Sequence, residues 1–525
     1  MMPLILQRCL STFVVVSILL CIPPTWAQDR NPDAGARRPN IILITTNVLR
    51  YNHLVPYGYE RDTAPTINAL AGEAFIFDSA FAQAGYTLPN MMSILTSLYP
   101  LSHGVLDAFK DKLPQRIRTL AEILKIHGYK TAWFANLSEP HLFTSVGFGR
   151  GYDDQFGLYR DLNTAGRIAE WVQQNRNERF FITVNSRHTH SPYFPLPRYK
   201  SRFSAGDKGD LPENPEVYLQ LIYRDIVDQM ERSDGLLYNV YDESTKTAIK
   251  KMVPGSASGL RFWSETFDRI RLLTPNNKQY LLSRIRMQAY TSRVQVDNPE
   301  NIAYITAMYD GCILGVDQEL IKPLIKTLKE NKIYDNTLII FTADHGESLG
   351  EHGLVGHGLV YWDQVIHVPL IIKLPGKTKA ARIQGLVQSI DIMPTVLDYL
   401  NIEIPYQAQG NSLLPMMQNP STESPYQYVY GANRQAAYLR DHNWKLIAPR
   451  NGGNDTIDRL ILYDMKSDPG ENINVVGSHP DLKAELLNRL TTHLTSLPNY
   501  VNVQHDFPDD MDEETRERIK KTGYW

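Results

Sequence analysis

The segment with the most groups able to do chemistry is FTADHGESLGEHGLVGHG, residues 341–358. Here the apolar run NTLIIFTA ends directly at Asp344 and His345, and His352 and His357 follow beside glycines. A carboxylate and imidazoles of this kind are ligands for a metal ion or an anion. A polar turn with solvated histidines is the alternative. The Asp-His pair at a strand end, followed by two glycine-flanked histidines, favours the ligand cluster.

A second candidate is AGYTLPNMMSILTSLYP, residues 84–100, in which Thr87 stands two residues before Pro89. The run MMSILTSLY predicts a helix whose N-terminus lies near this hydroxyl. Free N–H groups and the helix dipole at such a place favour a phosphate or sulfate group, or a metal-bound alkoxide. Threonine also caps helices, and this stretch alone does not decide between a cap and a reactive hydroxyl.

The third candidate is the turn after the run NIILITT, at the start of the globular sequence. A strand that ends in an acidic pair and leads to a helix often holds a divalent cation. In this chain the turn carries Thr46, Asn47 and Val48 instead of acids. The sequence therefore raises the question of whether the protein is an enzyme or only retains the fold of one.

The elements that must position these residues are short apolar runs without alternation, namely NIILITT, YKTAWFANL, RFFITVNS, NTLIIFTA and VPLIIKL. Such runs are typical of strands covered on both faces. Helix-like stretches lie between them, among them APTINALAGEA, RTLAEILKIHG and DQELIKPLIKTLKENKIY. This alternation predicts an α/β fold with a doubly wound, mostly parallel sheet sandwiched by helices. Ligands of such sheets bind beyond the carboxyl ends of the strands.

Two departures from the alternation suggest the domain organisation. Residues 38–424 are predicted to form the α/β domain, with a charged helical insertion at about 212–301 that is either a lid or a peripheral buttress. Residues 425–525 are predicted to form a smaller α+β subdomain. Its antiparallel strands would be YQYVYGA, QAAYLRD, NWKLIAP and RLILYDM, followed by the helix PDLKAELLNRLTTHLTSL packed against the main domain.

Residues 1–27 are predicted to be a signal peptide. Arg8 precedes the run STFVVVSILLCI, which is too short to span a bilayer comfortably, and Ala27 offers a small-residue cleavage site. Export to the periplasm or the medium is expected, with no transmembrane segment in the mature chain. A lipid anchor on Cys21 is the alternative, but the preceding Leu20 is larger than such sites normally accept.

Composition narrows the classes of partner. The 525 residues are 43% hydrophobic and 21% charged, with a formal net charge of −3. This balance supplies no basic field for nucleic acid. Two of the three cysteines lie in the predicted leader, so Cys312 is alone in the mature chain and no intrachain disulfide can form. Cys312 is expected to be a small buried apolar residue.

Placed in order, the motifs resemble the sulfatase branch of the alkaline-phosphatase superfamily over nearly the whole mature chain. RRPNIILITTNVLRYNHLVPYGYERDTAPTINALA is similar to its opening strand and helix, and YTLPNMMSILTSLYPLSHGV to its nucleophile helix. The later motifs, in family order, are RHTHSPY, YDGCILGVDQEL, TADHGESLGEHGLVGHG, VQSIDIMPTVLDYLNI, QGNSLLP, NWKLI and LYDMKSDPGE. The resemblance implies a metal-dependent hydrolase or transferase acting on sulfate or phosphate esters of small molecules or glycans.

The chain departs from the family at its expected centre. Family members usually carry one or two aspartates after the first strand, where this chain has Asn47 and Val48. Sulfatases have a cysteine or serine that is oxidised to formylglycine, with an arginine four residues on, where this chain has Thr87 and Met91. Threonine is not a substrate for that oxidation. It is, however, the nucleophile in phosphoryl-transfer branches of the superfamily.

The resemblance also implies roles for individual residues. The implied metal ligands are Asn47, Thr87, Asp344 and His345. The divalent ion would be calcium if the protein is sulfatase-like, and zinc or manganese if it is phosphatase-like. The implied catalytic residues are Thr87, His190 and His357: His190 matches a substrate-binding histidine, and His357 a lysine or histidine facing the transferred group.

Three functions remain open from the sequence. The first is a metal-dependent ester hydrolase with Thr87 as its nucleophile. The second is a binding or regulatory protein that has kept the fold but lost catalysis, because Asn47, Val48 and Met91 all remove charge from the site. The third is a transferase that moves a phosphoryl or phospho-alcohol group between exported glycans or lipids. Bound metal would separate the second function from the other two.

Overall fold

The computed structural model of the protein describes residues 38–106, 111–135, 144, 146–157, 163–209, 211, 290–291, 293–358, 360–376, 379–450 and 459–500. The predicted signal peptide, residues 1–27, lies outside the described residues, as does most of the predicted helical insertion at 212–301. In the part that is described, no helix is both long and apolar enough to cross a membrane.

An eight-stranded sheet forms the centre of the fold. In spatial order its strands are β10 (Ala381–Gln388), β2 (Phe75–Phe81), β9 (His367–Lys373), β6 (Thr337–Ala343), β1 (Asn40–Thr46), β5 (Phe180–Ser186), β3 (Lys130–Ala135) and β4 (Asp154–Gly157). Every residue of β1, β5, β6 and β9 is buried, which explains why their sequences are apolar without alternation. The doubly wound, mostly parallel sheet is therefore confirmed.

Strand β9 is the exception to the parallel arrangement, because it runs antiparallel to both of its neighbours, β2 and β6. Strands β2 and β10, which pair in parallel beyond it, were not among the predicted strands. A strand buried on both faces has the same apolar sequence whichever way it runs. The direction of β9 is therefore set by the connections of the chain.

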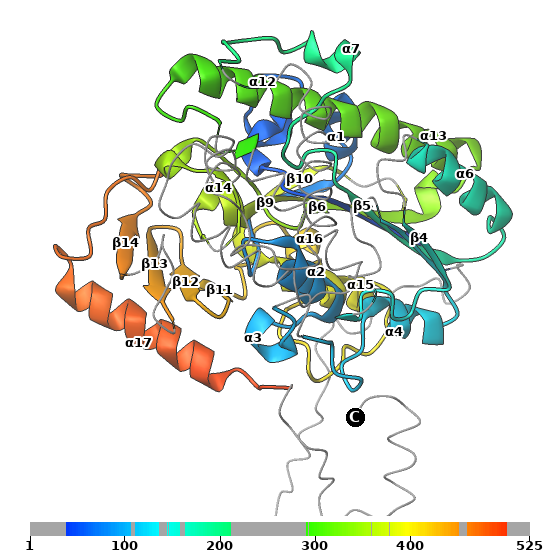
Figure 1. The fold of residues 1–525 in the computed structure, drawn as a ribbon. Helices are drawn as coiled ribbons and strands as arrows, with labels where there is room; N and C mark the ends of the chain where they lie inside the picture. Colours follow the sequence, from blue (N-terminus) through cyan, green and yellow to red (C-terminus); the bar gives the residue numbers. More distant parts are fainter. Residues whose placement is uncertain are drawn as a thin grey trace, which may run out of the picture. The chain divides into compact units, whose positions relative to one another are not determined.

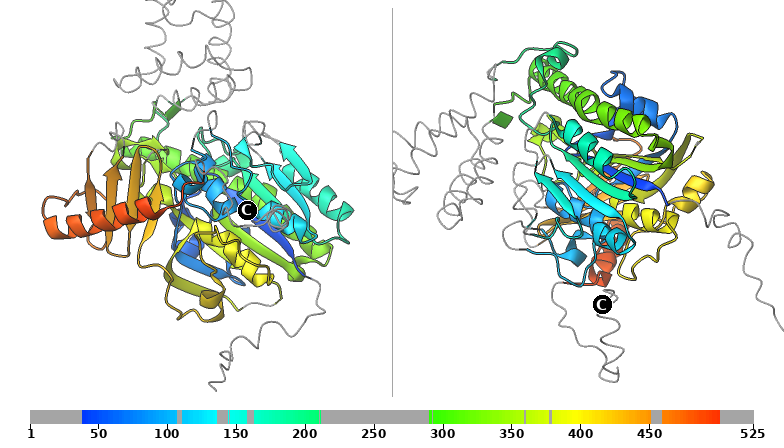
Figure 2. Two further views of the ribbon diagram at one scale, coloured as in Figure 1. Left: turned by 90° about the horizontal axis from the view of Figure 1, so that it is seen from below. Right: turned by 90° about the vertical axis from the view of Figure 1, so that its right-hand side faces the viewer.

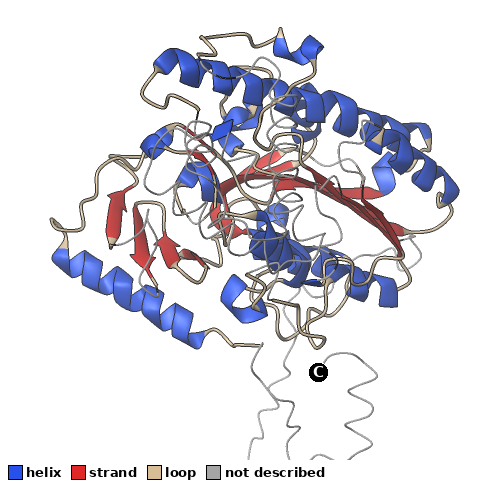
Figure 3. Ribbon diagram, in the orientation of Figure 1, coloured by secondary structure: helices blue, strands red, loops and turns tan. Residues whose placement is uncertain are grey.

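Helices cover both faces of this sheet and form the outer layers of a three-layer arrangement (Figures 1, 2 and 3). On one side lie α1 (Pro65–Ala71), α6 (Thr164–Gln174), α7 (Pro197–Lys200), α12 (Pro299–Val316) and α13 (Lys322–Glu330). On the other lie α2 (Thr87–Thr96), α3 (Pro100–His103), α4 (Leu120–Ile126), α15 (Ile392–Tyr399) and α16 (Leu414–Gln418). Cys312, on α12, is buried in the core as predicted.

Several short helices, turns and a hairpin connect the long elements of the α/β domain. They are 3₁₀ turns at Tyr51–His53, Val55–Tyr57, Tyr334–Asn336, Glu351–Gly353 and Ser389–Asp391, a π turn at Asp317–Ile321, the helix α14 (Asp363–Ile366) and the hairpin of β7 (Ser348–Leu349) and β8 (Val355–Gly356). The π turn joins α12 to α13, so the helix begins well before the predicted start. Its Asp317 carboxylate accepts hydrogen bonds from Thr66 N and Ile67 N and thereby caps α1 from a distance.

The C-terminal part is a second sheet with one helix. Strands β11 (Val429–Ala432), β12 (Ala436–Arg440), β13 (Trp444–Pro449) and β14 (Ile461–Asp464) are antiparallel throughout. On one face of this sheet, Tyr438 and Ile447 pack against Phe81 and Trp362 of the α/β domain. The other face packs against the helix α17 (Pro480–Ser496), which runs along the sheet in Figure 1. The helix was predicted to pack against the main domain, but it packs mainly on the C-terminal sheet. Near its C-terminal end, His493 contacts Tyr99 of the α/β domain.

A buried ion-pair cluster joins the two sheets. Lys445 Nζ lies 2.9 Å from Asp363 Oδ1 and 2.6 Å from Glu471 Oε1, and its side chain is fully buried. Arg440 Nη2 lies 2.8 Å from Asp363 Oδ2. Burial alone would raise the pKa of Asp363, but the charges of Arg440 and Lys445 outweigh it and hold that pKa below its usual value. The contact between the two sheets therefore contains two basic side chains, Lys445 and Arg440, paired with two acidic ones, Asp363 and Glu471.

Candidate active site

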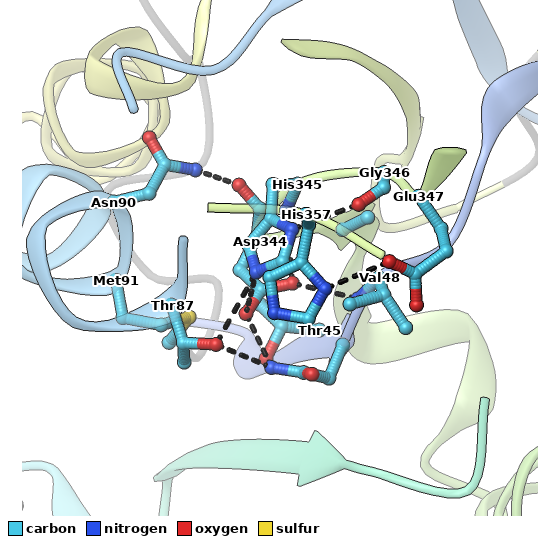
Figure 4. Close-up of polar contacts among 12 residues, drawn as sticks. Thr45, Val48, Thr87, Asn90, Met91, Asp344, His345, Gly346, Glu347 and His357 are labelled. Atoms are coloured by element: carbon cyan, nitrogen blue, oxygen red, sulfur yellow. Dashed lines mark hydrogen bonds and ion pairs between the residues drawn. The ribbon is translucent and has the colours of Figure 1, made fainter. Parts of the chain in front are cut away.

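The predicted site residues come together at the carboxyl ends of the central strands. Asn47 follows β1, His190 follows β5, and Asp344 and His345 follow β6, while Thr87 is contributed by the first turn of α2. Because β1, β5 and β6 are parallel neighbours, their carboxyl ends lie at one edge of the sheet. Figure 4 shows Thr87, Asp344, His345 and His357 grouped at this edge.

The turn after β1 directs two hydrogen-bond donors at the Asp344 carboxylate. Asn47 Nδ2 lies 2.5 Å from Asp344 Oδ2, and the backbone nitrogen of Val48 lies 3.1 Å from Asp344 Oδ1. Val48 has a φ of 54°, a left-handed conformation that is strained for a β-branched residue. His345 N also donates to Asp344 Oδ1, at 2.9 Å, and Asn90 Nδ2 donates to the Asp344 carbonyl. Asp344 is thus fixed in place by neutral donors.

The Thr87 hydroxyl lies between an amide and an imidazole. Its Oγ1 accepts a hydrogen bond from Asn47 Nδ2 at 2.7 Å and lies 3.3 Å from His345 Nε2. The helix-cap interpretation is wrong, because Tyr86 occupies the cap position and no side chain caps α2. The hydroxyl is instead directed at the groups that follow β1 and β6.

The proton positions on this group follow from its partners. His345 Nδ1 lies 2.8 Å from the Gly346 carbonyl oxygen, which can only accept, so Nδ1 carries a proton. Burial lowers the pKa of His345, which keeps the ring neutral and leaves Nε2 as an acceptor. The Thr87 O–H therefore donates to His345 Nε2. The hydroxyl and the imidazole are thus joined by a hydrogen bond whose proton lies on the oxygen.

One buried imidazole, that of His345, and two partly buried ones lie in a row at the site. The ring centroids of His345 and His357 are 4.4 Å apart, and those of His357 and His190 are 4.9 Å apart. His190 Nδ1 donates to the Ser191 carbonyl oxygen at 2.7 Å, and burial lowers the pKa of His190 well below its usual value. The structure therefore places His357 beside His345, and His190 beside His357.

Glu347 is a member of this group that the sequence analysis did not single out. Its side chain is fully buried, its Oε1 lies 2.8 Å from His357 Nδ1, and burial raises its pKa to about 8. The contact has a local cause, since Ser348 pairs with Gly356 in the β7–β8 hairpin and Glu347 and His357 are the next residues outward. The glycines between Glu347 and His357 were the sequence signal that could have indicated a tight hairpin bringing these two side chains together.

Three other residues of the quoted motifs have contacts of their own. The His352 ring stacks on Trp362, with centroids 4.0 Å apart, and so packs towards the C-terminal sheet. The Nδ1 atom of His188 lies 3.1 Å from the hydroxyl of Ser186. Met91, which stands where the resemblance would put an arginine, accepts a hydrogen bond from Asn185 through its sulfur at 3.5 Å. No positive charge replaces that arginine at position 91.

The donor set is compatible with a divalent cation, but it is weakly charged. Across the described ranges, no group of three or more His, Cys, Asp or Glu side chains is arranged to hold a metal ion. Asn47 turns its nitrogen, which cannot bind a cation, towards Asp344 and Thr87, while its Oδ1 is buried without a hydrogen-bond partner. A half-turn of this amide would exchange the two atoms. Asn47, Thr87, Asp344 and His345 would then offer three oxygens and one nitrogen with a single negative charge.

The fold and the site together define an α/β protein of the alkaline-phosphatase type, in which a hydroxyl at a helix start faces an Asp-His pair at the sheet edge. Residues 39–402 match the model of the family described as Sulfatase, so the chain belongs to the sulfatase family. Residues 350–499 match a second family, described as N-sulphoglucosamine sulphohydrolase, C-terminal.

Similar proteins cover nearly the same length. The chain is 24% identical to an N-acetylglucosamine-6-O-sulfatase of Bacteroides thetaiotaomicron, over 88% of this chain and 89% of the relative. It is 30% identical to arylsulfatase K of Bos taurus, over 93% and 88%. Among solved structures, the phosphonate monoester hydrolase of Agrobacterium radiobacter superposes with a TM-score of 0.62 at 21% identity, covering 87% of this chain and 95% of that one. This last likeness shows the fold alone.

Proposed function

We propose that the protein is an exported, metal-dependent hydrolase of sulfate or phosphate esters, with Thr87 as its nucleophile. The observation that carries the proposal is the Thr87 hydroxyl, placed in the first turn of α2 and hydrogen-bonded to a neutral His345. The names of the relatives support the reaction class, since they include sulfatases of amino sugars. A sulfated or phosphorylated glycan, or a small ester, is the proposed substrate.

Different side chains at the site are proposed to act in different parts of ester cleavage. His345 Nε2 accepts the hydrogen of Thr87 Oγ1, which directs an oxygen lone pair at the sulfur or phosphorus of a bound ester. Attack of Oγ1 would form a covalent ester with Thr87 and break the bond from sulfur or phosphorus to the alcohol oxygen, and the alcohol would leave with the proton that Thr87 loses. Attack of water on the Thr87 ester would then release sulfate or phosphate and restore the hydroxyl. His190 and His357 are the proposed contacts of the oxygens of the transferred group, and their rings adjoin each other near His345.

A cation would complete this site, and its proposed ligands are Asn47, Thr87, Asp344 and His345. Because Nδ1 of His345 carries a proton, the cation would bind at Nε2 and take the place of the hydrogen bond from Thr87. When bound, it would lower the pKa of the hydroxyl and shield the negative charge of the ester. Calcium is the proposed ion for a sulfatase-like chemistry, and zinc or manganese for a phosphatase-like one. Asn47, as a neutral ligand, would leave the affinity low.

The proposal predicts that aryl phosphates are turned over faster than aryl sulfates by the purified mature protein. A threonine ester lacks the hydrate with which formylglycine expels sulfate, so a sulfated Thr87 is expected to break down slowly. The measurement compares both esters before and after treatment with EDTA, with metal content determined on the same sample. Stoichiometric metal without turnover of either ester would instead indicate a transferase, and neither metal nor turnover would indicate a binding protein.

Asn47→Asp is predicted to raise cation affinity, because it adds an anionic oxygen at unchanged side-chain length. We expect the dissociation constant to fall by about tenfold or more, which is roughly 1.4 kcal/mol of binding free energy. Without metal the variant is expected to melt at a lower temperature than wild type, since two carboxylates would replace the amide–carboxylate contact. Titration calorimetry and thermal melts with and without metal measure both effects.

Asn298→Asp is the matched control for that experiment. It adds the same charge at the N-cap of α12, where aspartate caps as well as asparagine. Its metal affinity and its melting temperature are expected to stay close to those of wild type. An Asn47→Asp variant with no gain in affinity would show that residue 47 does not face a cation.

A further inference from the structure

We propose that Glu347 is a positioning residue for the reaction at Thr87, and that it acts by fixing the orientation and tautomer of His357. The inference rests on the proposed function for its kinetic consequence. Its structural basis is independent, because Glu347 and His357 are consecutive cross-strand neighbours beyond the paired residues of the β7–β8 hairpin. Their Oε1 and Nδ1 atoms are 2.8 Å apart.

His357 links this carboxylate to the reacting group. Its ring lies 4.4 Å from the ring of His345, whose Nε2 is 3.3 Å from the Thr87 hydroxyl. A hydrogen bond at Nδ1 decides which ring nitrogen carries the proton, and thereby whether Nε2 donates or accepts towards the transferred group. Glu347 therefore controls a property of the site without contacting substrate itself.

The fold does not need this carboxylate. The backbone of Glu347 makes the local contacts, because its N–H donates to the Gln364 carbonyl at 2.9 Å and its carbonyl accepts from Arg50 at 3.3 Å. Both contacts would persist with another side chain. The acid itself is fully buried, with the Tyr193 hydroxyl near enough to lower its pKa, and burying it costs stability. A buried acid that contacts an imidazole of the candidate site is typical of a functional residue.

Two substitutions separate positioning from structural support. Glu347→Gln keeps an oxygen that can accept from His357 Nδ1, whereas Glu347→Leu removes the acceptor. We expect kcat for aryl phosphate to fall about tenfold in the first variant and about a hundredfold in the second, with KM nearly unchanged. Both variants are expected to melt at or above the wild-type temperature. A structural role predicts the reverse, namely lower melting temperatures in both.

Glu351→Gln is the matched control, since Glu351 lies on the same hairpin but pairs with Arg50 at 2.6 Å. It is expected to lower the melting temperature slightly and to leave kcat within about twofold, because a partly exposed ion pair contributes little to stability. An unchanged kcat in Glu347→Leu would overturn the inference. A loss of kcat that came with a lower melting temperature in both Glu347 variants would overturn it as well.

Imidazole ¹⁵N spectra test the inference without any turnover. In wild type we expect one tautomer of His357, with the proton on Nδ1, and in Glu347→Leu a mixture of both tautomers. His357→Gln assigns the resonance by its disappearance. Identical His357 spectra in wild type and Glu347→Leu would refute the positioning role. If wild type hydrolyses no ester, the proposed function fails, but the tautomer measurement still decides the case for Glu347.

Discussion

Thr87→Val is expected to abolish ester turnover, lowering kcat for aryl phosphate by about a thousandfold or more while the protein stays folded. Valine keeps the branched shape of threonine and removes only the oxygen that would attack the ester. It also leaves Asn47 Nδ2 and His345 Nε2 without their shared partner. Stability is therefore expected to fall by about 1–2 kcal/mol, which is too little to unfold the domain. Steady-state kinetics and a thermal melt on the same sample measure both effects.

Thr96→Val is the control for this substitution. Thr96 is buried on the same helix, and its hydroxyl donates to the Met92 carbonyl at 2.7 Å, away from the site. The control is expected to lose a similar amount of stability and to keep its turnover. Turnover that survives in Thr87→Val would exclude Thr87 as the nucleophile. Absence of turnover in wild type and in both variants would favour a binding protein with the fold of an enzyme.

Lys445→Met is expected to lower the free energy of unfolding by about 3–5 kcal/mol. The substitution removes the cation that lies between Asp363 and Glu471, and leaves two buried carboxylates with Arg440 paired only to Asp363. Methionine fills much of the space of the lysine stem, so the loss reports the missing charge rather than a cavity. Urea denaturation followed by fluorescence measures the change.

Lys326→Met provides the comparison for the buried lysine. Lys326 pairs with Glu330 at 3.6 Å on the surface of α13, where both side chains are largely exposed. Such pairs contribute about 0.3–0.5 kcal/mol, so this variant is expected to unfold almost like wild type. Equal effects of the two substitutions would mean that the ion-pair cluster between the sheets does not stabilise the fold.

Much of the fold could be predicted because a strand that is buried on both faces consists almost entirely of apolar residues. The run NIILITT predicted a strand at the centre of the sheet, and β1 occupies those residues, Asn40–Thr46. The same reasoning could not give the direction of β9, since a strand buried on both faces looks alike in either orientation. Strand β2 was missed because FIFDSAF carries polar residues inside an apolar run.

The place of the site could be predicted, but its internal contacts could not. Thr87, Asp344 and His345 were expected near one sheet edge, and the structure brings them within hydrogen-bonding distance of Asn47 or of one another. The sequence does not show whether the Asn47 amide turns its nitrogen or its oxygen towards Asp344, and this orientation decides whether it donates a hydrogen bond or could bind a cation. The pairing of Glu347 with His357 depends on the register of a two-residue hairpin, which glycine-rich segments specify weakly.

The distances along the chain between the site residues also determine when the site can form. Asn47 and Asp344 are 297 positions apart, and β1 lies between β5 and β6, which are made much later. Closing such long loops is slow and must precede the contacts that reward it. A growing or truncated chain that ends before β6 can contain the Thr87 helix but neither the carboxylate nor the base. The candidate site can therefore form only after β6 has been made.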